Sequence, residues 1–153
     1  MTSIDLTSDE LIEVVEFFAA RLALMDETAV RTRSADHPCT VIEILGQLVD
    51  SAANYHQYFV RALSTDCLEF PGYDPQAWVE CQHYAHYPWD NLVQFWKLYN
   101  IQLAHIIRQI PDAKMRVKCT ILPERPVSLS FLIEEYLTQT KEKLNKITER
   151  SGI

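Results

Sequence analysis

Glycine is scarce in this chain, and the scarcity disfavours all-β architectures, whose tight turns depend on it: only 3 of the 153 residues are Gly. No stretch approaches the roughly 18 consecutive apolar residues that a membrane-spanning helix requires. The segment from Met1 to Glu10 contains three acids and no base, unlike the basic start of a signal peptide. We therefore expect a globular, cytoplasmic protein with no membrane-spanning segment.

Basic residues and paired cysteines are also few. Lys and Arg number 14 against 21 Asp and Glu, for a formal net charge of −7, so the dense basic surface that binds nucleic acid is missing. The 4 cysteines form no Cys-x-x-Cys pair, and we interpret them as reduced, partly buried apolar side chains rather than reactive or metal-bound thiols. A Gly-x-Ser-x-Gly elbow, a P-loop and a dinucleotide fingerprint are all absent, so no standard nucleophile or nucleotide site is indicated.

The sequence shows helical periodicity, with apolar residues spaced three and four apart, over most of its length. The length predicts a single domain over residues 1–153, large enough to fold without a structural metal. Thr7 and Glu10 form a capping box that predicts the start of the first helix. A second capping box, formed by Thr40 and Glu43, predicts a helix from about residue 41 to 63.

Two further long helices follow. The third begins near Trp89, ends at Pro111 and includes Phe95 in its apolar stripe. The fourth is capped by Ser128 and ends before Gly152. Four amphipathic helices of this length predict an all-α fold, a four-helix bundle.

Two long connections, residues 64–87 and 112–127, are expected to cross the bundle. The first contains the turn sequence from Phe70 to Tyr73. Asp74 and Pro75 then predict a short extra helix over 75–84, between the second and third long helices. The stretch from Met115 to Leu122 is β-prone and could be extended.

The second long helix carries the most specific signal. It reads ILGQLVDSAANYHQYFVRA over residues 44–62 and resembles the DinB-like family of small bacterial four-helix proteins. The likeness spans roughly residues 38–147 and continues through four further segments: Leu68 to Tyr73, Trp89 to Trp96, Tyr99 to Pro111 and Val127 to Tyr136. The resemblance implies a bundle that is often dimeric. Members bind a metal, and some act as thiol-dependent transferases or hydrolases.

The resemblance also implies where a metal would be held. In that family one His in a Gly-His-Leu segment and a His-x-x-x-His pair bind nickel or zinc, because imidazoles at i and i+4 converge on one ion. The matching positions here are Gln47, Gln139 and Lys143, and none is histidine. We therefore expect the metal site to be lost, with no cofactor.

Two interpretations of these three positions remain open. They are boundary polar residues with a snorkelling amine, or they line an altered pocket in which Lys143 takes the place of the cation. In the second case the ammonium would hold an anion or pair with a carboxylate, for which the candidates are Glu43, Asp50 and Glu135.

Other polar and aromatic residues are candidates for a pocket. We interpret His56 as a core histidine hydrogen-bonded to a neighbouring helix and His105 as structural, with a pocket role as the alternative. The candidate pocket residues are Asn54, His56, Tyr58, His105 and Tyr136. Two alternative metal sites are also considered: the Cys-x-His-x-x-His segment of Cys81, His83 and His86, and His56 with a carboxylate.

The sequence thus favours a non-catalytic binding or regulatory protein, a scaffold that has lost its metal site, that forms a homodimer and takes a small-molecule ligand. It predicts no nucleic-acid or membrane partner. The alternative is a nickel- or zinc-dependent, thiol-dependent transferase or hydrolase with non-standard ligands.

Overall fold

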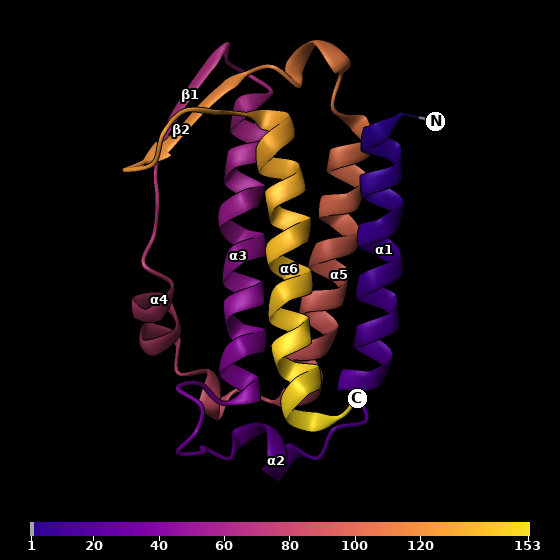
Figure 1. Cartoon of the computed structure of the whole chain (residues 1–153), viewed down its shortest axis with the longest axis vertical. Coiled ribbons are helices and arrows are strands. Elements are labelled where there is room, and N and C mark those ends of the chain that lie inside the picture. Colours follow the sequence, from indigo (N-terminus) through magenta and orange to yellow (C-terminus); the bar gives the residue numbers. More distant parts are fainter. Residues whose placement is uncertain (1) are drawn as a thin grey trace.

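Four long helices stand side by side in the computed structural model of the protein, which describes residues 2–153 (Figure 1). They are α1 (Ser3–Leu22), α3 (Val41–Ala62), α5 (Trp89–Gln109) and α6 (Leu129–Ser151). Both α1 and α3 pack against α5 and α6. The expected four-helix bundle is therefore confirmed.

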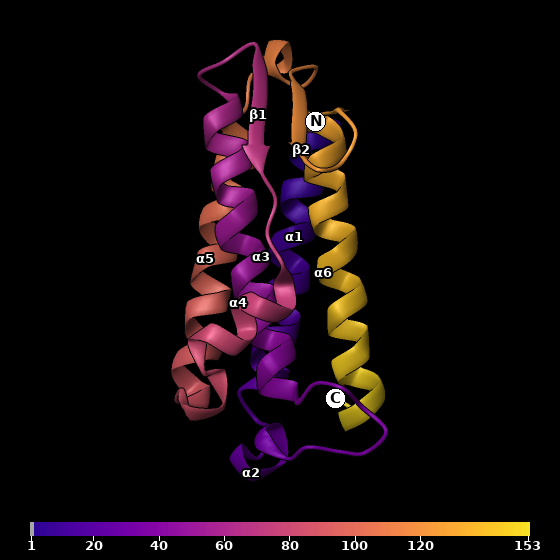
Figure 2. The same ribbon diagram turned by 90° about the vertical axis from the view of Figure 1, so that its left-hand side faces the viewer.

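The helix directions explain the two long connections. In Figures 1 and 2, α3 and α5 run the same way along the bundle, and α1 and α6 run the opposite way. The connection after α3 must therefore return the chain along the bundle before α5 begins. The connection between α5 and α6 stays at one end, so the expectation that it also crosses the bundle was wrong.

A small sheet at that end makes the all-α prediction wrong in part. β1 (Cys67–Pro71) pairs in parallel with β2 (Lys118–Leu122), and β2 pairs antiparallel with β3 (Val127–Ser128). The β-prone stretch named from the sequence contains β2. The sheet ties the start of the crossing segment to the chain that leads into α6.

The predicted turn at Phe70 to Tyr73 is instead mostly extended chain. Phe70 and Pro71 lie in β1, and the backbone N–H of Gly72 donates to the carbonyl of Leu122 at 2.9 Å. A Cβ at position 72 would lie 2.6 Å from that carbonyl oxygen. Position 72 requires glycine because its backbone lies too close to that of Leu122 to leave room for a Cβ. A turn and a strand edge can both require glycine for this reason.

Most helix boundaries follow their capping residues. The capping box of Thr40 and Glu43 is present at the start of α3, and the Ser128 hydroxyl accepts from the backbone N–H of Phe131 in α6. Asp74 caps the short helix α4 (Pro75–Gln82). That helix ends two residues earlier than predicted, because His83 adopts the left-handed conformation, with φ at 53°.

The start of α1 was predicted wrongly. Thr2 and Asp5 form the capping box, and the Thr7 hydroxyl instead donates to the Ser3 carbonyl at 3.0 Å, inside the helix. In the box that is formed, the Asp5 carboxylate accepts from the Thr2 backbone N–H at 3.0 Å and the Thr2 hydroxyl accepts from the Asp5 backbone N–H at 3.1 Å. Three short elements were not expected: α2 (Glu27–Arg31), η1 (Tyr84–His86) and η2 (Asp112–Lys114).

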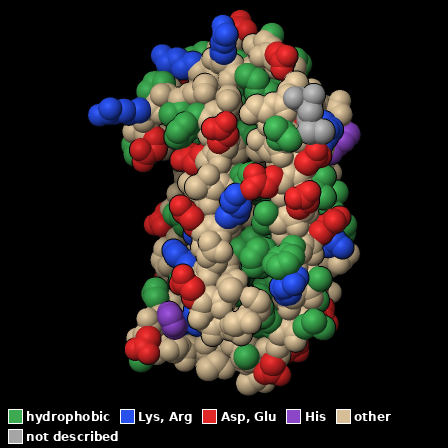
Figure 3. All heavy atoms as spheres, turned by 45° about the vertical axis from the view of Figure 1, so that its right-hand side comes forward, with side chains coloured by type: hydrophobic (Ala, Val, Ile, Leu, Met, Phe, Trp, Pro, Cys, Tyr) green, Lys and Arg blue, Asp and Glu red, His purple; other side chains and the backbone are tan. Residues whose placement is uncertain are grey.

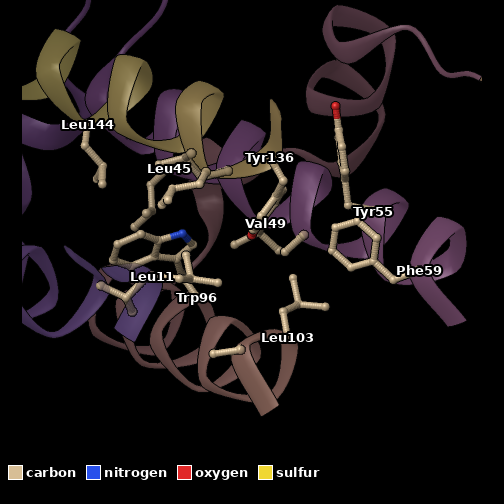
Figure 4. Packing of buried hydrophobic residues seen from close by; sticks show 14 of the residues in the cluster. Leu11, Leu45, Val49, Tyr55, Phe59, Trp96, Leu103, Tyr136 and Leu144 are labelled. Atoms are coloured by element: carbon tan, nitrogen blue, oxygen red, sulfur yellow. The ribbon is translucent and has the colours of Figure 1, made fainter. Parts of the chain in front are cut away.

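The core is built from large side chains of all four long helices. Figure 4 shows Leu11 of α1, Leu45 of α3 and Leu144 of α6 around the indole of Trp96. Trp89 is also fully buried, and its indole N–H donates to the Leu22 carbonyl at 2.8 Å. Phe95 was expected to join this core but is 49% exposed, since it lies on the outer side of α5.

The surface is mixed in character. The face drawn in Figure 3 carries acidic and basic side chains close together, with hydrophobic side chains gathered near its centre. Within residues 2–153, no helix combines the length and apolar character needed to cross a membrane.

Candidate functional site

Gln47 and Lys143, two of the three positions matched to metal ligands, are in contact. Lys143 Nζ of α6 donates to Gln47 Oε1 of α3 at 3.1 Å, and Gln47 Nε2 lies 3.7 Å from the Cys39 sulfur. Both side chains are half-buried. They line a cavity of about 290 Å³ together with residues of the segment before α3 and the last turns of α6, including His37, Lys146 and Arg150.

Gln139, the third position, lies one turn earlier on α6 and lines a different cavity. Its Oε1 is 3.5 Å from the Tyr55 hydroxyl, a weak hydrogen bond. This larger cavity, of about 810 Å³, is called the cleft below. The structure thus brings two of the three positions together and directs the third to the neighbouring cleft.

These three side chains do not fit a divalent transition metal. Nickel and zinc favour imidazole and thiolate, whereas an amide oxygen is a weak ligand and an ammonium offers no lone pair. Burial, and then the neighbouring Lys146, lower the pKa of Lys143 from its usual value. Across residues 2–153, no group of three or more His, Cys, Asp or Glu side chains is arranged to hold a metal ion.

None of the carboxylates considered for Lys143 pairs with it. Glu43 binds Arg33, with 2.6 Å between Arg33 Nη2 and Glu43 Oε1, and also caps α3. Asp50 and Glu135 are engaged by tyrosine hydroxyls. Among the described residues the ammonium of Lys143 therefore has an amide acceptor and no ion pair.

The cleft lies between α3, α6, the segment joining β1 to α4, and the loop that joins β2 to β3. Four aromatic rings line it: Tyr55, Tyr58, Tyr73 and Phe131. Its charged residues are Asp74, Glu124, Arg125 and Glu135. Three carboxylates against one guanidinium make the cleft acidic, and its aromatic walls make it suitable for an organic ligand.

Glu135 and Tyr55 form the polar centre of the cleft. The Tyr55 hydroxyl donates to Glu135 Oε2 at 2.8 Å. Burial first, and then the hydrogen bond and charge of Glu135, raise the pKa of Tyr55 above its usual value. Burial likewise raises the pKa of Tyr73 to about 12. Both phenols are therefore neutral hydrogen-bond donors at physiological pH.

Asp50 is a buried acid that the sequence analysis considered only as a partner for Lys143. It is 2% exposed, and its Oδ1 accepts from Tyr84 Oη at 2.6 Å and from Gln82 Nε2 at 2.8 Å. Its Oδ2 is buried without a partner. Burial raises the pKa of Asp50 in spite of these two hydrogen bonds, which act in the opposite direction. The sequence offered one signal for this buried acid, a carboxylate that stands among apolar residues in the middle of a predicted helix.

Only one of the five candidate pocket residues lines the cleft. Tyr58 does so, whereas Asn54 donates to the Asp50 carbonyl and Tyr136 is buried against Asn100. His105 is exposed on α5. The Nδ1 of His56 lies 2.8 Å from the Tyr99 hydroxyl of α5, as expected for a histidine bonded to a neighbouring helix, but the side chain is half-buried and not in the core.

The alternative metal site at Cys81, His83 and His86 is not formed. All three side chains are exposed, and they form no group able to hold a metal. The left-handed conformation of His83 ends α4 at Gln82. Cys81 therefore lies in the helix and the two histidines lie outside it, so the three do not share a helix face. All 4 cysteines are free thiols, and Cys67 and Cys81 are exposed rather than partly buried as expected.

Comparison with known proteins identifies the fold. YfiT from Bacillus subtilis, described as a probable metal-dependent hydrolase with an unusual four-helix bundle topology, superposes with a TM-score of 0.78. The two sequences are 21% identical, and the match covers 94% of this chain and 85% of YfiT. No family model matches the sequence, and no curated protein matches it. The likeness to YfiT establishes a shared bundle fold.

Proposed function

We propose that this protein is a metal-independent binding protein on a bundle scaffold like that of YfiT, and that it binds a small organic molecule in the cleft. The observation that carries the proposal is the hydrogen bond from Lys143 Nζ to Gln47 Oε1, at 3.1 Å. These are two of the three positions at which the DinB-like resemblance implies metal-binding imidazoles.

This contact opposes metal binding for an electrostatic reason. A protonated Lys143 repels a divalent cation, and its hydrogen bond also occupies one of the two lone pairs of the Gln47 oxygen. For a metal ion to bind there, Lys143 would have to lose its proton and its hydrogen bond to Gln47 would have to break. Glu135, a carboxylate of the cleft on the same helix as Lys143, is bonded to Tyr55.

The cleft supports the binding part of the proposal. Its volume of about 810 Å³ lies in the range of small-molecule sites, and such sites combine apolar and aromatic walls with a few directed polar groups. The hydroxyl of Tyr55, the carboxylate of Glu135 and the amide of Gln139 are the directed groups here.

Metal analysis of the protein purified without chelator tests the proposal. We expect nickel and zinc far below one ion per chain after dialysis. About one tightly bound ion per chain would contradict the proposal and support the alternative, a metal-dependent transferase or hydrolase with other ligands. Native mass spectrometry of the same sample should reveal any organic molecule that copurifies.

A further inference from the structure

The aromatic walls of the cleft come from three separate parts of the chain. Tyr55 and Tyr58 project from α3, Tyr73 from the segment between β1 and α4, and Phe131 from the first turn of α6. The rings of Tyr55 and Tyr58 pack edge to face, with centroids 5.2 Å apart. Phe131 is 50% exposed although it is a large apolar side chain at the cleft wall. Phe131 and the half-buried Tyr73 therefore leave parts of their rings uncovered, whereas Tyr55 and Tyr58 are 7% and 3% exposed and are largely covered by the protein's own side chains.

A carboxylate without a cationic partner lies among these rings. Glu135 is half-buried and accepts one hydrogen bond, from Tyr55 at 2.8 Å. None of the ion pairs among the described residues includes it. After burial, the charge of Glu135 also contributes to raising the pKa values of Tyr55 and Tyr58. One of its oxygens thus remains available to a ligand.

The other charges of the cleft reinforce this polarity. Asp74 is committed to capping α4, where it accepts from the backbone N–H groups of Gln76 and Ala77. Glu124 and Arg125 are exposed in the loop between β2 and β3 and offset one another. Glu135 is therefore the charged group at the centre of the cleft, in a chain whose net charge is −7.

We infer that the cleft binds an organic cation, an amine or quaternary ammonium on an apolar body, with its charge against Glu135 and the exposed ring of Phe131, one turn earlier on the same face of α6. This inference rests on the proposed binding function and names the class of its ligand. Aromatic faces attract ammonium groups through their quadrupole, and a neighbouring carboxylate strengthens that attraction where water is excluded. An anionic ligand would instead meet the carboxylate of Glu135, and the one cation among the described residues of the cleft, Arg125, lies next to Glu124 in the chain.

Choline and its uncharged isostere, the alcohol in which carbon replaces the quaternary nitrogen, provide matched probes. They share shape and hydroxyl and differ in charge. Titrations of the full chain followed by NMR, with assigned signals of the cleft residues, measure both affinities. We expect choline to shift these signals and to bind about tenfold or more tightly than the alcohol.

Glu135→Gln tests the assigned carboxylate. The amide oxygen can still accept from Tyr55, so the fold is retained, and the affinity for choline should fall about tenfold while that for the alcohol stays the same. Glu134→Gln is the matched control, because Glu134 is the exposed neighbour outside the cleft and makes the same change in net charge. Phe131→Ala removes a partly exposed ring and should weaken both probes.

The outcomes separate the inference from the proposed function. Equal affinity for the two probes, or equal loss in Glu135→Gln and Glu134→Gln, would overturn the cation inference and leave a binding cleft for neutral ligands. If neither probe shifts any cleft signal at millimolar concentration, the inference fails. Copurification of a neutral or anionic ligand in the cleft would overturn it while supporting the proposed function.

Discussion

Lys143 Nζ donates to Gln47 Oε1 across 3.1 Å, which joins α6 to α3. The contact places an ammonium beside an amide at two positions where the resemblance implies imidazoles. Because a dication and an ammonium cannot share this space favourably, the pair bears directly on whether the bundle holds a metal.

Placing imidazoles at the three matched positions tests this interpretation. We expect the triple variant Gln47→His, Gln139→His, Lys143→His to acquire nickel or zinc, since the two His of α6 would stand at i and i+4 on one face opposite a third on α3. Bound metal is measured by mass spectrometry after dialysis. Lys143→Met, which removes the ammonium without adding a ligand, is the control and should stay metal-free. A folded triple variant without metal would show that the matched positions are wrong.

The contribution of Asp50 to the free energy of unfolding should fall as the pH rises. A carboxyl whose pKa is raised on folding binds its proton more tightly in the folded state, so its contribution is fully present below the ordinary pKa of 3.8 and is lost as the pH passes the raised value. Urea unfolding of the wild type and Asp50→Asn across acidic to neutral pH measures this. The variant should be more stable relative to the wild type at neutral pH than at low pH; a constant difference would contradict the prediction.

Gly46 should not tolerate alanine. A Cβ at this position would lie 2.6 Å from Cε2 and 2.7 Å from Cγ of Tyr84, whose ring is held by Asp50. Gly to Ala inside a helix normally stabilises by roughly 0.5–1 kcal/mol, but here overpacking should destabilise by about 1–3 kcal/mol. Thermal and urea unfolding give the sign. A gain in the free energy of unfolding would show that Tyr84 moves aside without cost.

Removing the hydroxyl of Tyr136 should destabilise the folded protein. The side chain is fully buried and donates to Asn100 Oδ1, so Tyr136→Phe leaves a buried acceptor unsatisfied. We expect a loss of about 1–3 kcal/mol in the free energy of unfolding. Tyr87→Phe is the control, because Tyr87 is exposed and its change should have little effect. Equal effects of the two substitutions would contradict this account.

The association state is also open to measurement. We expect a homodimer, and the exposed Phe95 and Leu98 of α5 are apolar side chains that such an interface could cover. Sedimentation at high micromolar concentration tests it, with a monomer as the contradicting result.

Local patterns predicted much of the fold. Thr40 and Glu43, Asp74 and Ser128 act on backbone groups at most three residues away, so the helix starts that they mark could be read along the chain. Periodicity likewise identified the four long helices. Near the start of α1, two successive boxes, over residues 2–5 and 7–10, satisfied the same rule, and the chain used the earlier one.

The candidate site was only partly predictable. Gln47, Lys143 and Gln139 were named from the sequence, but the division between two cavities depends on where α3 and α6 meet. Glu135 was named as a partner for Lys143 and is instead bonded to Tyr55, some 80 residues earlier in the chain. Asp50 was matched to the same lysine and is bonded to Tyr84.

The sequence by itself determined the helices and their caps, because these depend on hydrogen bonds and apolar spacing within a few residues. Only the tertiary structure decided the sheet, the exposed side of Phe95 and the acidic aromatic cleft. Cys67 to Pro71 pairs with Lys118 to Leu122 across some fifty intervening residues, and no local preference specifies which distant strand, ring or carboxylate will be brought alongside.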